Sequence, residues 1–204
     1  GSYKVIGIRG LIMNQSYYSM EKSEYLDDAF HSFTNITATP YIKFEGSNWT
    51  ADLGLNVSGL FDVKTKVFIS PNLKAAIHFN EVNTFYGEVT GGINNNTFLD
   101  ILQENRYVIP MMRVEYSKTL FDAKIGFKSG VLSGFEFDLF AGYKKTDKDH
   151  LYVANPSWIL GTDDIPCPNV GLPLYANVGT GHVGGLLKTN LIPYTDLSLR
   201  ATAY

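Results

Sequence analysis

The chain has 204 residues, a formal charge of -3 and a pI near 5.8. Because nucleic-acid-binding domains present basic surfaces, this charge balance argues against nucleic acid as a partner. Charged residues make up 18 % of the chain, below the roughly 25 % usual in soluble domains, and aromatic residues reach 14 %. The composition favours β-sheet and a sparsely charged surface. No Pro- or Ser-rich linker divides the chain, so we expect one β domain over residues 1–204.

Two structural classes are excluded by what the sequence lacks. Cys167 is the only cysteine, so neither an intrachain disulfide nor a multi-cysteine metal site can form. No run of about 18 apolar residues occurs, which excludes a membrane-spanning helix. The absence of such a run does not exclude a membrane β-barrel, because the strands of a barrel are only half apolar.

The first half of the chain predicts long strands. Residues 3–12 are rich in β-formers, and 13–36 predict a long loop. Apolar and polar residues alternate from residue 37, most regularly between Trp49 and Phe61. That run is longer than the roughly 5 to 6 residues of an average strand in a soluble protein. It reaches the roughly 9 to 11 residues that a tilted strand needs to cross a bilayer. Its aromatic ends are typical of a membrane girdle.

The middle of the chain predicts shorter elements. Residues 63–69 and 73–79 form a predicted hairpin around Ser70-Pro71-Asn72, and 85–91 continue the β pattern. Residues 97–107 have apolar residues at helical spacing behind Thr97, a candidate N-cap. The alternation changes parity near Thr119, which predicts a β-bulge.

The last third centres on a hairpin over 121–144, whose two limbs alternate strictly around a Gly- and Ser-rich turn. Residues 145–174 predict a long connection, 175–187 a glycine-rich strand, and 197–203 a last strand. The fold class is therefore all-β, an antiparallel meander of about ten to twelve strands that forms an outer-membrane β-barrel or part of one. Long and short connections alternate in the second half, as they do in such barrels.

Strand alternation assigns two sets of side chains. In a barrel the polar set would face the lumen and, through charges of both signs, would set the solute preference. This set comprises Thr50, Asp52, Asn56, Lys74, His78, Asp122, Lys124, Lys128, Glu136, Asp138 and Lys144. The apolar set would face lipid or a core and comprises Trp49, Leu53, Leu55, Phe61, Phe135, Phe137, Leu139 and Tyr143.

The runs TFYGEVTGGINNNTFLDILQENRYVIP and DAKIGFKSGVLSGFEFDLFAGYK resemble outer-membrane β-barrel proteins of the Bacteroidetes, porin-like or related to the barrels of TonB-dependent receptors. The resemblance implies an outer-membrane location in a Gram-negative bacterium, contact with lipid, and either a pore or transport role for an unknown small solute or a structural role. Tyr204 falls outside the apolar register of the last strand, so we expect an internal segment of a larger barrel, with Gly1-Ser2 as a cloning remnant. Open strand edges would then favour self-association.

A different class of function fits the same alternation. The chain could form a soluble or surface-anchored β-sandwich, at the cell surface or in the periplasm, that binds glycans or a protein. Its exposed aromatic residues would be Tyr17, Tyr18, Tyr25, Trp158 and Tyr175. No motif for a hydrolase, a metal centre or a phosphate loop is present, so we expect no enzyme activity, metal or cofactor.

Overall fold

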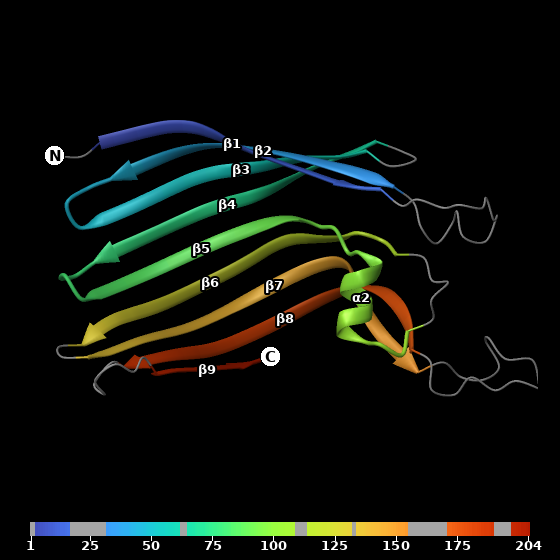
Figure 1. Cartoon of the computed structure of the whole chain (residues 1–204). Coiled ribbons are helices and arrows are strands. Elements are labelled where there is room, and N and C mark those ends of the chain that lie inside the picture. Colours follow the sequence, from blue (N-terminus) through green and yellow to red (C-terminus); the bar gives the residue numbers. More distant parts are fainter. Residues whose placement is uncertain are drawn as a thin grey trace, which may run out of the picture.

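The computed structural model describes residues 3–16, 32–61, 65–108, 114–131, 134–154, 171–189 and 197–204. Nine strands form a single antiparallel sheet in chain order (Figure 1), which confirms the all-β meander. The elements are β1 (Tyr3–Gln15), β2 (Phe33–Glu45), β3 (Trp49–Phe61), β4 (Lys66–His78), β5 (Asn83–Asn94), α2 (Phe98–Glu104), β6 (Ser117–Val131), β7 (Phe135–Ala154), β8 (Gly171–Thr189) and β9 (Leu197–Ala203).

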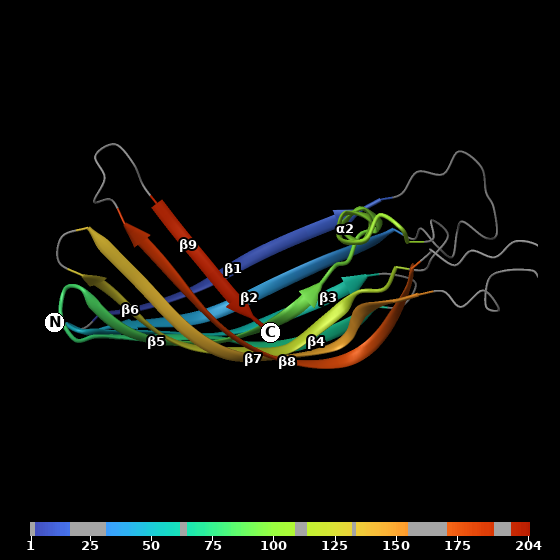
Figure 2. The ribbon, with the colours of Figure 1, turned by 90° about the horizontal axis from the view of Figure 1, so that it is seen from below.

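The sheet is curved and open. Figure 2 shows the strands bowed into a trough, with α2 above its concave side at one end. Among the described strands, β1 pairs only with β2 and β9 pairs only with β8. Both outer strands therefore keep one free backbone edge, and self-association through these edges stays a prediction.

Several strands are longer than the sequence pattern indicates. The predicted hairpin around Ser70-Pro71-Asn72 is wrong, because β4 runs straight through these residues and pairs with β3 along its length. The β4 ladder to β5 stops at Asn72, next to the proline, which lacks the N–H that a ladder needs. Two predicted strands are thus one, and the described residues hold nine strands instead of ten to twelve.

The two predicted long connections are shorter than expected. β1 extends to Gln15 and β2 begins at Phe33, within the stretch predicted as a loop. β7 continues to Ala154 and β8 begins at Gly171. A bulge between Thr146 and Asp149 lets β7 continue through its charged run, and the predicted bulge near Thr119 is confirmed.

The connections differ between the two ends of the sheet. At one end the strands are joined through 46–48, 79–82, 132–134 and 190–196, all short. At the other end the joining segments are 16–32, 62–65, 95–116 and 155–170, three of which are long. With β4 continuous, the connections alternate between the two ends along the whole described sheet, and 62–65 is the exception, as short as 79–82 at the opposite end.

One helix lies in a long connection. Thr97 caps α2: its hydroxyl accepts the Asp100 N–H at 3.0 Å, while the Asp100 carboxylate accepts the Thr97 N–H. The predicted helix and its cap are confirmed. No helix in the described part of the chain is both long and apolar enough to cross a membrane.

The only cluster of buried apolar side chains among the described residues lies under α2. Ile101 is fully buried and packs with Val108 and Val114, and Phe98 and Tyr152 pack around them. This cluster fixes α2 to the end of the trough. It leaves the broad apolar side of the sheet uncovered.

Candidate functional site

The sheet has two chemically distinct faces. All eleven residues of the predicted polar set lie on one face, opposite the predicted apolar set, as the strand registers show. We call them the polar face and the apolar face. The polar face is hollowed, because residues from β1, β2, β3, β5, β6 and β7 line one cavity on it.

The apolar face is exposed over the whole width of the sheet. Its side chains include Ile8 in β1, Ile69 in β4, Leu139 in β7 and Leu199 in β9, with exposed fractions of 72, 65, 57 and 68 %. Scattered apolar side chains are normal on soluble proteins, but a contiguous apolar face marks a surface that contacts lipid or a partner.

Ion pairs cross the strands on the polar face. Arg9 in β1 binds Asp52 in β3 at 2.6 Å, over the intervening β2. Glu88 in β5 binds Lys124 in β6 at 2.6 Å and lies 4.0 Å from Lys74 in β4. These pairs balance charge across the sheet, and because they are partly exposed each contributes little to stability.

A further ion pair and a tyrosine contact extend this arrangement toward β7. Lys128 binds Glu136 at 2.6 Å. The Tyr86 hydroxyl donates to Asp138 at 2.8 Å, and its ring lies over Gly126, where a Cβ atom would collide with it. Aromatic rings that cover a cross-strand glycine pin the register of neighbouring strands.

Toward the α2 end the polar face becomes neutral. The Thr39 hydroxyl donates to Asn56 Oδ1 at 2.6 Å, and Asn72 donates to the same oxygen at 3.1 Å. Asn56 Nδ2 donates to the Gly91 carbonyl at 2.7 Å, and Thr37 and Ser58 share a hydrogen bond of 2.8 Å.

Two cavities hollow the polar face. The α2-end cavity has a volume of about 600 Å³, and the β9-side cavity has about 610 Å³. Hydroxyl and amide groups dominate the first; charged and aromatic groups dominate the second. Asp122 and Lys144 line both cavities. Small-molecule sites have volumes in this range.

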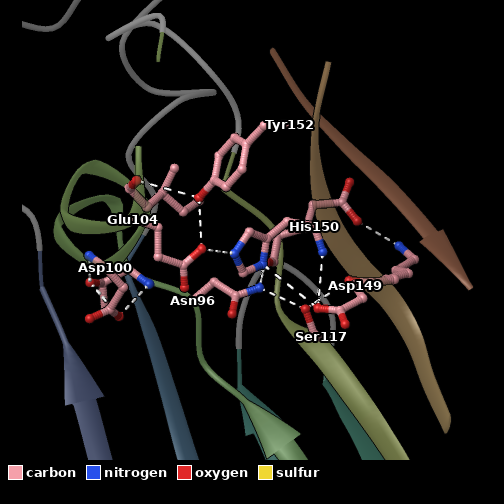
Figure 3. A network of polar contacts seen from close by, with 11 residues as sticks. Asn96, Asp100, Glu104, Ser117, Asp149, His150 and Tyr152 are labelled. Atoms are coloured by element: carbon pink, nitrogen blue, oxygen red, sulfur yellow. Dashed lines mark hydrogen bonds and ion pairs between the residues drawn. The ribbon is translucent and has the colours of Figure 1, made fainter. Parts of the chain in front are cut away.

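A polar network fastens α2 to the trough (Figure 3). His150 Nε2 lies 2.7 Å from Glu104 Oε2, and the Tyr152 hydroxyl donates to the same oxygen at 2.9 Å. Just before the helix cap, Asn96 donates to Ser117 at 2.7 Å, and Ser117 donates to the Lys148 carbonyl. The helix therefore has polar anchors as well as its apolar cluster.

Acidification is expected to loosen this anchor. Burial raises the pKa of Glu104, but the hydrogen bonds from His150 and Tyr152 together lower it by more. The pKa of Glu104 therefore lies below the ordinary 4.5. A lowered carboxyl pKa means that the contribution to stability is complete above pH 4.5 and is lost as pH falls below it. Hydrogen exchange of the 98–104 amides, corrected for intrinsic rates, should show weaker protection at pH 3 than at pH 6. Glu104→Gln should remove this step, and an unchanged step in that variant would contradict the assignment.

Alternation alone missed several residues of the polar face. Arg9, Glu88 and Tyr86 lie there, and their signal is cross-strand register, which places Glu88 opposite both Lys74 and Lys124. Tyr175, one of the aromatics expected to bind a partner, instead accepts the Glu115 N–H at 2.8 Å. The other four, Tyr17, Tyr18, Tyr25 and Trp158, and also Cys167, lie outside the described residues.

Comparison with known proteins identifies no relative: no protein-family model, curated protein or solved structure matches the chain. Within the described residues, no three His, Cys, Asp or Glu side chains gather as a metal site.

Proposed function

We propose that the chain forms part of the wall of an outer-membrane β-barrel in a Gram-negative bacterium, with a non-catalytic pore or transport role. The observation that carries the proposal is an apolar face exposed across the nine-stranded sheet, opposite a hollowed polar face on which ion pairs join strands from β1 to β7. The apolar face would contact lipid and the polar face would line a water-filled passage. This fits the resemblance of residues 84–144 to outer-membrane barrels.

Strand length and loop asymmetry support the same proposal. β1 to β4 each have 13 residues, more than the roughly 9 to 11 that a tilted strand needs to cross a bilayer. All four connections at one end are short and three of the four at the other end are long, an asymmetry that outer-membrane barrels share. A lipid-embedded sheet needs partners for the free edges of β1 and β9, so further strands would complete the barrel.

Trp49 gives a direct test, because it lies on the apolar face at the start of β3 and is 40 % exposed. In a Trp158→Phe background, Trp49 is the only tryptophan. Reconstituted into vesicles with brominated acyl chains, this variant should lose most of its fluorescence, since bromine quenches rings that it contacts. The companion variant Trp49→Phe retains only Trp158, so its quenching is measured separately and compared with that of Trp49.

Two results would contradict the membrane role. A chain that stays monodisperse in buffer without detergent, and whose Trp49 is not quenched, does not place its apolar face in lipid. It would instead fit the soluble or surface-anchored sandwich that binds glycans or a protein.

A further inference from the structure

We infer that Asp122 and Lys144 form a binding site for a zwitterionic solute, a free amino acid or a short peptide. The inference rests on the proposed function, since it names the class of solute that the polar face would take. The supporting observation is that two opposite charges have no ion-pair partner among the described residues. The two residues are direct partners on neighbouring strands β6 and β7.

Most carboxylates on the polar face are already occupied. Asp52 binds Arg9, Glu88 binds Lys124, and Asp138 accepts from Tyr86. Asp122 and Lys144 differ: although they are register partners, neither has an ion-pair partner among the described residues. The Asp122 Oδ1 atom is buried and accepts no hydrogen bond. A buried carboxylate oxygen without a donor is costly, so a donor-bearing ligand would relieve it.

The position of this pair suits a ligand. Both side chains line both cavities, so a solute held there reaches into the α2-end cavity and the β9-side cavity at once. An ammonium group would bind Asp122, and a carboxylate would bind Lys144. Arg200 lines the β9-side cavity as a second cation for the carboxylate. Charge-assisted hydrogen bonds of this kind are about twice as strong as neutral ones.

The neutral wall of the α2-end cavity extends the match from an amino acid to a peptide. Asn35 is 5 % exposed, and its Oδ1 atom accepts no hydrogen bond. The Oδ1 atom of Asn95 is also buried and accepts no hydrogen bond. Both residues line this cavity. Two unused acceptors in a wall of hydroxyl and amide groups fit the N–H donors of a peptide backbone.

The test uses the whole chain in detergent micelles, where binding does not depend on insertion into a bilayer. Trialanine and alanine are the probes, followed by saturation-transfer NMR and calorimetry. N-acetyl-trialanine amide lacks both terminal charges, and maltotriose offers hydroxyl donors without charge. Trialanine should bind, and the blocked peptide should bind at least tenfold more weakly. Binding of alanine as tight as that of trialanine would overturn the peptide-binding role of Asn35 and Asn95.

Variants locate the site. Asp122→Asn and Lys144→Gln should each weaken trialanine binding roughly tenfold, the loss of one charge-assisted contact. The double exchange Asp122→Lys with Lys144→Asp keeps both charges at neighbouring positions and should recover part of the affinity. Glu136→Gln lies outside both cavities and is the matched control, which should bind normally. Circular dichroism confirms that each variant keeps its β structure.

The outcomes separate this inference from the proposed function. The zwitterion site would be overturned if the blocked peptide bound as tightly as trialanine, or if maltotriose bound and trialanine did not. Quenching of Trp49 by brominated lipid would still uphold the membrane role in either case. Trialanine binding without lipid quenching would uphold the site and overturn the membrane role.

Discussion

Under the proposed membrane role, Leu139→Arg should destabilise the protein in a lipid bilayer by about 2 to 4 kcal/mol, the cost of placing an arginine on a lipid-facing strand position at the bilayer midplane. Leu139 is 57 % exposed on the apolar face. It lies at the centre of the apolar run of β7, between Phe135 and Tyr143. Urea titration of vesicle-embedded protein, followed by tryptophan fluorescence, measures the change in the free energy of unfolding.

Ala76→Arg is the matched control for this substitution. Ala76 lies on the polar face of β4, opposite Thr50 and Tyr86, so an arginine there reaches the hollow of the trough. Its cost should be within about 0.5 kcal/mol, as for an ordinary surface change. If Leu139→Arg were as mild as Ala76→Arg, or improved solubility without detergent, the apolar face would not contact lipid.

The division of the sheet into two faces was predictable from sequence because strand alternation is a local property. Trp49, Leu53 and Phe61 share a face whatever strand lies beside them, since the side-chain period of a strand is two. The same reasoning found α2, whose cap consists of two residues three positions apart. Local chemistry suffices for both.

The extent of the strands was not predictable in the same way, because partner strands decide it. Ser70-Pro71-Asn72 has the composition of a turn, yet pairing with β3 holds it extended. The charged run after Lys144 has the composition of a loop, yet β8 pairs with it across a bulge where Lys148 adopts a positive φ of 55°. Tertiary pairing overrides local preference at both places.

The candidate solute site shows the same limit. Asp122 and Lys144 were both predicted on the polar face, but their lack of ion-pair partners depends on which neighbours take the other charges. Glu88 lies in register with Lys124 and binds it, so that lysine is not free for Asp122. The sequence predicts which charged residues share a face, and only the strand register shows which of them have no ion-pair partner.

Gly142→Ala should destabilise the sheet by about 1 to 3 kcal/mol, the usual cost of overpacking. A Cβ atom at Gly142 would lie 2.5 Å from His182 Nε2 and 2.6 Å from the Ala123 carbonyl oxygen. The histidine ring can rotate away. The carbonyl belongs to the backbone of β6, so the clash can be relieved only by moving two paired strands apart.

Gly181→Ala provides the comparison, because Gly181 pairs with Tyr143, the next residue along β7, and has nothing within 4 Å of its Cβ position. Alanine in a strand is favoured over glycine by about 0.5 to 1 kcal/mol, so this variant should be neutral or slightly more stable. Urea unfolding of both variants in detergent micelles measures the difference. Equal stability of the two would mean that β6 and β7 do not approach as closely at Gly142 as the register requires, and the shared wall of the two cavities would then have a different shape.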